Sequence, residues 1–162
     1  MEIRDARGDD WPAIWPILQR IVAAGETYTL PRDLDPERGR RIWMLEPPDR
    51  TVVAVDEDGT VLGSAKMNRN HQGPASHVAS ASFIVAPEHS GKGVGRALGE
   101  HVIDWARDAG YRAMQFNAVV ETNTRAVALW RSLGFEVIGT LPEGFQHPVH
   151  GYVGLHIMHR RL

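Results

Sequence analysis

The stretch Phe83–Glu100, FIVAPEHSGKGVGRALGE, decides how this chain folds. It opens with three apolar residues, Phe83 to Val85, as a buried strand does. It then passes through a glycine-rich segment, Ser90–Arg96. The apolar residues that follow have the spacing of one helix face: Val94, Ala97, Leu98 and Val102. The stretch therefore predicts a strand that leads through a tight turn into a helix.

The glycine-rich turn has the features of a phosphate-binding site. Gly91, Gly93 and Gly95 let the backbone take positive φ angles and come close to a ligand. The first N–H groups of a helix have no partner within it, and the helix dipole favours an anion there. Lys92 and Arg96 add positive charge beside these donors. The turn therefore predicts a site for a phosphate or pyrophosphate group.

Two common phosphate-binding motifs do not fit this turn. The dinucleotide fingerprint G-x-G-x-x-G would place its third glycine on Arg96 or on Leu98, depending on where it starts. The P-loop pattern needs Ser or Thr after Gly-Lys, and here Gly93 follows Lys92. An ordinary strand–loop–helix connection remains the alternative, because short glycine motifs also occur by chance.

The segment Ser90–Gly95 resembles the acyl-CoA signature Q/R-x-x-G-x-G/A of the GNAT superfamily of N-acyltransferases. Both glycine positions match, and Ser90 stands where the signature has Gln or Arg. The flanking Val85–Glu88 and Arg96–Leu98 are also similar to that family. The resemblance implies acetyl-CoA as the acetyl donor. The residues it places at the donor are Phe83, Ile84, Val85, Ser90, Gly91, Lys92, Gly93, Val94, Gly95, Arg96, Asn123 and Trp130.

A second block, Asn117–Phe135, is similar to the later half of the same family. There an Asn precedes a helix that reads A-x-x-L-Y-x-x-x-G-F. The matching residues here are Asn123, Ala126, Leu129, Gly134 and Phe135. The resemblance implies that Asn123 binds the pantetheine arm of CoA. An Asn at this place is also a good helix cap, so Asn123 can serve either purpose or both.

Trp130 departs from the family pattern, which often has Tyr at this place to protonate the leaving thiolate. An indole N–H donates a hydrogen bond but does not act as an acid near neutral pH. Because Trp130 lies on the apolar face of its predicted helix, we expect it in the core. A hydrogen bond to the CoA sulfur is the alternative. Without the Tyr, protonation of the thiolate by water would have to suffice.

Composition places the chain among single-domain enzymes and binding proteins. Its 162 residues, 43% hydrophobic and 23% charged, predict one folded domain over residues 1–162. A net charge of −2 gives no reason to expect nucleic acid or an anionic membrane as partner. The absence of cysteine excludes disulfides and a cysteine nucleophile. With no apolar run of membrane-spanning length and no signal pattern, we expect a cytoplasmic protein.

Periodicity and turn residues divide the chain into strands and helices. Strands are predicted at residues 1–6, 51–55, 60–67, 78–86, 113–119, 135–140 and 152–159. Helices are predicted between Asp10 and Gly25, from Pro36 to the pair Pro47-Pro48, from the glycine turn to Gly110, and from Asn123 to Gly134. Pro16 is expected to kink or delay the first helix. Residues 141–151 are expected to form a loop.

This order of elements predicts an α/β (α+β) domain in which a mixed sheet carries helices on its faces. It matches the GNAT order along essentially the whole chain. The resemblance implies a mostly antiparallel sheet of about seven strands flanked by about four helices. It also implies a homodimer, since dimers are frequent in the family.

The reaction that the resemblance implies is attack of a neutral amine on the thioester of acetyl-CoA. Holding the two reactants together supplies much of the acceleration. Backbone N–H groups near Ile84 and Val85, where the family's strand carries a bulge, are the expected donors to the oxyanion. A base must take a proton from the ammonium, and the candidates are Glu26, His77 and Glu121. A solvated surface role is the alternative for each of them.

The string Phe116–Asn123, FNAVVETN, resembles the branch that includes the fungal proline-analogue N-acetyltransferases. These enzymes also carry Trp where other members have Tyr. In them an Asn at the position of Ser80 works with the one at Asn117. The resemblance implies catalytic roles for Asn117 and Ser80, although Ser80 departs from the pattern. The alternative for Asn117 is a structural polar group satisfied by neighbouring backbone.

The acceptor amine is expected to contact residues from three parts of the chain. These are Glu26 and Tyr28 after the first helix, His77 before the central strand, and His147 and Tyr152 near the C-terminus. The segments around His147 and Tyr152 resemble the end of small-amine acetyltransferases, which closes over the acceptor. No set of histidines has the compact spacing of a zinc site, so no metal is expected.

These observations predict an N-acetyltransferase that moves the acetyl group of acetyl-CoA to the primary or secondary amine of a small molecule. The acceptor would be an amino acid or an analogue. The acetyl group would pass directly within a ternary complex, because no cysteine can hold it. The alternatives are an acetyltransferase for peptide N-termini or lysine, and a non-catalytic acyl-CoA-binding module.

Overall fold

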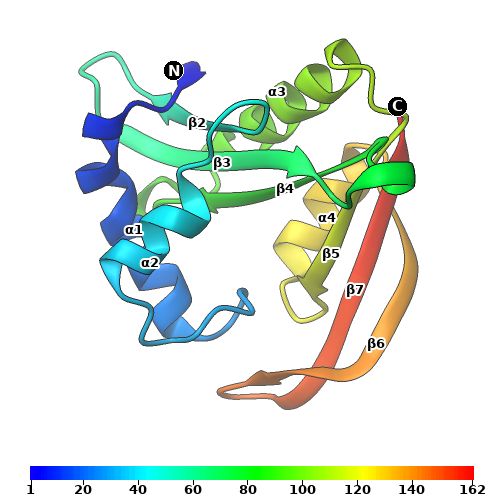
Figure 1. Ribbon diagram of the computed structural model, residues 1–162. Coiled ribbons are helices and arrows are strands. Elements are labelled where there is room, and N and C mark those ends of the chain that lie inside the picture. Colours follow the sequence, from blue (N-terminus) through cyan, green and yellow to red (C-terminus); the bar gives the residue numbers. More distant parts are fainter.

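A seven-stranded sheet forms the centre of the protein, in the order β1-β2-β3-β4-β5-β7-β6 (Figure 1). The computed structural model describes residues 1–162. The strands are β1 Glu2–Asp5, β2 Arg50–Val55, β3 Val61–Arg69, β4 Val78–Val85, β5 Ala113–Val120, β6 Glu136–His147 and β7 Gly151–Arg161. The helices are α1 Trp11–Ala24, α2 Pro36–Trp43, α3 Val94–Asp108 and α4 Thr124–Ser132. The predicted fold, a mostly antiparallel mixed sheet with four helices, is confirmed.

Strands β4 and β5 form the one parallel pair of the sheet, and they stay together over a short distance. Their pairing is limited to Val78 with Ala113 and Ala79 with Met114. Beyond that point the two strands diverge, as Figure 1 shows. A strand edge without a neighbouring strand keeps free N–H and C=O groups. The free edge of β4 therefore opens the middle of the sheet to a ligand.

Helices cover both faces of the sheet, and each face has its own core. α1 and α2 pack on one face, where Ile14 and Trp43 are fully buried. α3 and α4 pack on the other, where Trp130 is buried. Because strand residues alternate between faces, β4 supplies Ile84 to the first core and Ala79 to the second. None of the helices is long and apolar enough to cross a membrane.

Helix α1 forms from the apolar stripe that the sequence shows, with Ile14, Ile17, Leu18 and Val22 buried. It runs from Trp11 to Ala24 with Pro16 inside it, so the expected delay of the helix is wrong. A proline within a helix costs about 3 kcal/mol. Each buried aliphatic side chain contributes about 1.5–3 kcal/mol, so the stripe outweighs that cost.

The hairpin of β6 and β7 is longer than predicted, because residues 141–147 and 151 belong to its strands. The expected loop is therefore wrong and shrinks to a turn at residues 148–150. Pairing shifts register between Leu141 and Phe145, where Glu143 takes a positive φ of 52°. This bulge absorbs the Pro and Gly that interrupt the strand pattern, and pairing resumes at Phe145 with Val153. The hairpin extends away from the rest of the sheet (Figure 1).

Candidate active site

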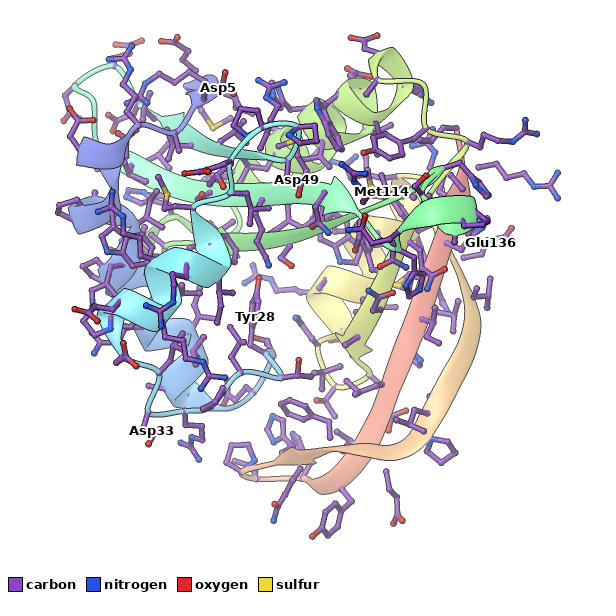
Figure 2. The ribbon with its side chains drawn as sticks, viewed as in Figure 1. Asp5, Tyr28, Asp33, Asp49, Met114 and Glu136 are labelled. Carbon is purple, nitrogen blue, oxygen red and sulfur yellow. The ribbon has the colours of Figure 1, made fainter.

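A cavity of about 970 Å³ opens where β4 and β5 diverge. Its walls come from these two strands, from the segment between α1 and α2, and from the first turn of α4. Figure 2 shows Tyr28 between the α1–α2 segment and the sheet. The cavity brings together most of the residues predicted to touch the donor or the acceptor: Glu26, Tyr28, Ser80, Phe83, Ile84, Val85, Ser90, Asn117, Asn123 and Trp130.

The glycine turn lies at the rim of this cavity. Ser90 lines the cavity, and the residues from Gly91 to Arg96 do not. Gly91 and Gly93 have φ angles of 78° and 84°, in the left-handed region that glycine adopts most readily. No side chain caps the N-terminus of α3, and its first turn contains no acidic residue. The N–H groups at this helix end are therefore free to bind an anion.

The two cations of the turn are placed differently. Arg96 is turned toward α4, because its Nη2 donates to Oγ of Ser132 at 2.8 Å. Its Nη1 also lies 3.8 Å from the carboxylate of Glu100. Lys92 is exposed and forms no ion pair with a carboxylate. The charge of Lys92 is therefore available to a ligand. Val94, in the same turn, is buried in the core.

Successive residues of β4 turn their backbone groups to opposite edges of the strand. The N–H of Ala86 bonds to the carbonyl of Leu62 at 2.9 Å, so Ile84 also faces β3. Phe83 and Val85 consequently face the free edge. Tyr28 confirms this direction, because its hydroxyl donates a hydrogen bond of 2.6 Å to the Phe83 carbonyl.

The bulge expected near Ile84 and Val85 is absent from the pairing of β3 with β4. The register runs without a shift from Gly63 with Val85 to Arg69 with Ala79. That expectation is wrong, and the divergence of β5 explains why no bulge is needed. With no neighbouring strand beyond Ala79, the N–H of Val85 is free at this edge.

Asn117 is exposed in the cavity, and both ends of its amide are hydrogen-bonded. Its Nδ2 donates to Oδ1 of Asn70 at 2.7 Å, and its Oδ1 accepts from Nε2 of Gln115 at 3.0 Å. The register of β5 with β7 shifts between Phe116 and Val119, so the strand is irregular around Asn117. Its partners are side chains rather than neighbouring backbone. Asn117 thus presents an oriented amide to the cavity.

Lys66 is a cavity residue that sequence reasoning missed. Lys66 on β3 pairs with Ser82 on β4, and Asn68, two residues further along β3, pairs with Ser80. Lys66 and Ser80 therefore lie on the same face of the sheet. Burial lowers the pKa of the Lys66 ammonium, and the charge of Asp49 partly offsets this. The signal available in the sequence was a lysine among the apolar residues of a strand.

The Lys66 ammonium has an aromatic neighbour but no counter-ion. It lies 6.0 Å from the centre of the Trp43 ring. No carboxylate comes within 4.0 Å of it. Trp43 is held in place by a hydrogen bond of 2.9 Å from its indole N–H to Oγ of Ser64. A half-buried cation is therefore exposed to the cavity with its charge unpaired.

Arg125, at the start of α4, is the second residue that sequence reasoning missed. It lines the cavity, and its Nη1 donates to Oγ of Ser90 at 2.9 Å. Asn123 lies two residues earlier and caps α4, since its Oδ1 accepts the N–H of Ala126 at 3.4 Å. Asn123 also lines the cavity, so capping leaves it within reach of a ligand.

Trp130 belongs to the core, as its place on the helix predicts. It is 7% exposed, and its ring centre lies 4.6 Å from that of Phe83 and 4.9 Å from that of Phe116. One part of it also lines the cavity. Trp130 therefore forms an apolar wall where the two strands diverge.

Three predicted acceptor contacts lie outside the cavity. His147 is buried, and its Nδ1 accepts the N–H groups of Val149 and His150 at 3.1 and 3.2 Å, which shapes the hairpin turn. Tyr152 is 64% exposed on β7. His77 lines a separate hollow of about 410 Å³. The structure does not bring these three residues to the remaining candidates.

Two of the three candidate bases, His77 and Glu121, also lie outside the cavity. Glu26 is the one acidic residue that lines the cavity. Glu121 is bound to β7, because its Oε1 accepts the N–H of Gly154 at 2.7 Å. No group of three or more His, Cys, Asp or Glu side chains is placed to hold a metal ion.

Comparison with known proteins identifies the family and the fold. The sequence model of the Acetyltransferase (GNAT) family matches residues 3–135. The chain belongs to this family. The matched residues include the free edge of β4, the glycine turn and the whole of α4, so the cavity just described lies within the GNAT match.

Two similar proteins are named as N-acyltransferases. L-amino acid N-acyltransferase MnaT of Escherichia coli is 33% identical over 148 residues, which cover 88% of this chain and 84% of that protein. N-acetyltransferase aca1 of Schizosaccharomyces pombe is 32% identical over 111 residues, 68% of this chain. That match covers 53% of aca1, so the chain spans about half the length of this relative.

Solved GNAT structures have the same fold. A GCN5-related N-acetyltransferase from Kribbella flavida is 61% identical, with a TM-score of 0.97 over 99% of this chain and 97% of that one. The phosphinothricin acetyltransferase of Sinorhizobium meliloti, solved with acetyl-CoA, is 27% identical, with a TM-score of 0.88 over 99% of this chain and 88% of that one. This GNAT protein is therefore an acetyl-CoA-dependent N-acetyltransferase.

Proposed function

We propose that this GNAT enzyme transfers the acetyl group directly to the primary or secondary amine of a small molecule, an amino acid or a close analogue. The observation that carries the proposal is the unpaired ammonium of Lys66 in the cavity. The name of MnaT, an L-amino acid N-acyltransferase, supports an acceptor of this class.

Lys66 favours an acceptor that carries a negative charge. A half-buried ammonium without a counter-ion is destabilising, and a carboxylate supplied by the acceptor would remove that penalty. The hydroxyls of Ser80 and Ser82 and the amide of Asn117 line the same cavity and can hydrogen-bond the polar groups of such an acceptor. An amino acid combines a carboxylate for Lys66 with an amine to acetylate.

The acetyl group passes directly from the thioester to the amine through a tetrahedral oxyanion. The neutral amine nitrogen attacks the thioester carbon, a C–N bond forms, and the C–S bond breaks to release the CoA thiolate. The N–H of Val85 at the free edge of β4 is our candidate donor to the oxyanion. Because the chain has no cysteine, no acyl-cysteine intermediate can form.

Proton transfers complete the reaction. Glu26, the acidic residue of the cavity, is our candidate for taking the proton of the acceptor ammonium, directly or through water. Once the C–N bond has formed, the nitrogen loses its surplus proton to water. Trp130 donates a hydrogen bond but no proton, so the thiolate takes its proton from water. A thiol has a pKa of roughly 8.5, which makes the thiolate a tolerable leaving group near neutral pH.

The test is acetyl-CoA-dependent thiol release with a panel of amino acids, their carboxamides, polyamines and short peptides. We expect release with one class of amino acid and much less with the matching carboxamide. Release with peptides or polyamines alone would contradict the proposed acceptor class. No release with any acceptor, in samples that bind acetyl-CoA, would contradict transfer to small amines altogether.

We also propose that the protein is cytoplasmic and that it is a homodimer, the dimer being what the family resemblance implies. The β6–β7 hairpin supports the dimer, because Ile138, Leu141 and Tyr152 are 58%, 57% and 64% exposed there. Exposed apolar side chains on an extended hairpin lose contact with water when a second subunit covers them. Light scattering should give twice the mass of one chain, and the mass of a single chain would contradict the dimer.

A further inference from the structure

This chain departs from the acyl-CoA signature at Ser90. The signature carries a long polar or cationic side chain, Gln or Arg, at this position. Ser90 is too short to reach far from the backbone, and its φ and ψ of −63° and 141° are extended values that most residues adopt. It is also exposed. The short side chain is therefore not imposed by backbone strain or by a lack of space.

The guanidinium of Arg125, from another part of the chain, lies beside Ser90. Its Nη1 donates to Oγ of Ser90 at 2.9 Å, although the two residues are 35 positions apart. A Cβ added to Gly91 would lie 3.0 Å from the other terminal nitrogen of the same guanidinium. The guanidinium thus lies directly against the first two residues of the turn. The bond to Ser90 uses one of its five N–H donors, and the others remain for a ligand.

The position of Arg125 also connects the two walls of the cavity. Ser90 follows β4, whereas Arg125 follows β5, and these strands pair no further than Ala79 and Met114. Both residues line the cavity, so a ligand bound between the walls can reach them. The α3 N-terminus, which begins after Gly93 and carries no side-chain cap, supplies anion-binding N–H groups on the same rim.

Arg96, the arginine within the turn, does not compete for this role. Its guanidinium is bound to Ser132 and lies near Glu100. Arg125 makes no ion pair with a carboxylate. Arg125 is therefore the guanidinium at the mouth of the cavity whose charge is not neutralised by the protein itself.

We propose that Arg125 binds the pyrophosphate of acetyl-CoA and takes the place of the side chain that the signature carries at position 90. Ser90 is then a positioning residue that holds the guanidinium over the turn. A guanidinium binds phosphate oxygens through paired N–H donors, which makes it suited to this task. This inference rests on acetyl-CoA as the donor, and on nothing about the acceptor.

The first experiment measures CoA binding by calorimetry, without any acceptor. Loss of a hydrogen-bonded charge should raise the Kd of CoA roughly ten- to a hundredfold in Arg125→Ala. The matched control is Arg131→Ala, an exposed arginine on the same helix that does not line the cavity. We expect that control to bind CoA as the wild type does. An unchanged Kd in Arg125→Ala would overturn the inference.

Two further measurements separate phosphate binding from a general loss of the site. Acetyl-pantetheine lacks the pyrophosphate, so its KM should be the same in the wild type and in Arg125→Ala. Adding Ser90→Arg to Arg125→Ala should restore most of the lost CoA affinity, because it restores the signature. A rise of KM for acetyl-pantetheine as large as that for acetyl-CoA would overturn the inference.

The outcome for Arg125 is independent of the outcome for the acceptor. Wild-type protein that binds CoA but acetylates no small amine would contradict the proposed function and leave this inference intact. Conversely, an active enzyme whose CoA affinity does not depend on Arg125 would contradict this inference alone.

Discussion

The hydroxyl of Tyr28 donates a hydrogen bond of 2.6 Å to the backbone carbonyl of Phe83, 55 residues away. This bond joins the segment between α1 and α2 to the free edge of β4, where the carbonyl has no strand to pair with. Burial raises the pKa of the Tyr28 phenol, so the hydroxyl stays protonated and remains a donor throughout the neutral range. Tyr28 thus fixes the distance between the two sides of the cavity.

Tyr28→Phe removes this bond and keeps the ring. We expect the free energy of unfolding to fall by about 1–2 kcal/mol, because the Phe83 carbonyl loses a partner. We also expect a higher KM for the acceptor, since the segment that carries Glu26 is no longer tied to the sheet. Thermal unfolding and steady-state kinetics measure both. Wild-type stability together with wild-type KM would show that the bond does not position the segment.

Gly93→Val tests the glycine turn as the phosphate site. Gly93 has a φ of 84° with no atom within 4 Å of an added Cβ, so the change strains the backbone without a clash. Gly110, at the other end of α3, has a φ of 83° and equally open space, which makes Gly110→Val a matched control. Both variants should lose about 1–2 kcal/mol of stability. Calorimetry should show weaker CoA binding in Gly93→Val alone, and equal affinities would place the site elsewhere.

Asn117→Ala tests the oriented amide. Asn117 is held by Asn70 and Gln115, so its amide can direct an acceptor without an ordering cost at the moment of binding. We expect kcat/KM for the acceptor to fall at least about tenfold, with the Kd of CoA unchanged. Asn70→Ala should give a smaller loss of the same kind. Wild-type turnover and acceptor affinity in Asn117→Ala would remove this residue from the active site.

Asp10→Asn tests an ion pair outside the cavity and its dependence on pH. Arg4 bonds both oxygens of Asp10 at 2.8 and 2.9 Å, and this hydrogen bonding lowers the pKa of Asp10 below its ordinary 3.8. A carboxyl whose pKa is lower in the folded protein stabilises it above the unfolded pKa, and the contribution is lost as the pH falls through the folded pKa.

We therefore expect Asp10→Asn to lose about 1 kcal/mol of stability at pH 7. The difference from the wild type should shrink as the pH is lowered below about 4. Urea unfolding at a series of pH values measures this. A difference that stays constant over that range would mean that the charge of Asp10 contributes nothing.

The elements that set the fold could be predicted because local sequence determines them. The apolar stripe of α1 and the glycine turn before α3 each combine a periodic pattern with a residue that begins or ends it. The end of the β6 strand could not be predicted, because Pro142 and Gly144 are residues typical of loops. Only the pairing of β6 with β7 shows that a bulge accommodates them.

Some residues of the cavity could be predicted from the sequence and others could not, for a related reason. Ser90 and Asn123 lie in motifs whose residues are close in sequence, so a pattern can find them. Lys66 and Arg125 are placed at the cavity by the tertiary fold, where Lys66 lies near Trp43 and Arg125 bonds to Ser90. These neighbours are distant in sequence, so no local pattern reveals them. His147 shows the opposite error, since its ring serves the hairpin turn.

The most direct test of the central claim compares wild type and Lys66→Met on an accepted amino acid and on its carboxamide. Met keeps most of the length of Lys66 and removes its charge. If Lys66 binds the acceptor carboxylate, the preference of the wild type for the acid should fall roughly ten- to a hundredfold in the variant. The carboxamide should be acetylated equally well by both. An unchanged preference for the acid would contradict the account of the acceptor site.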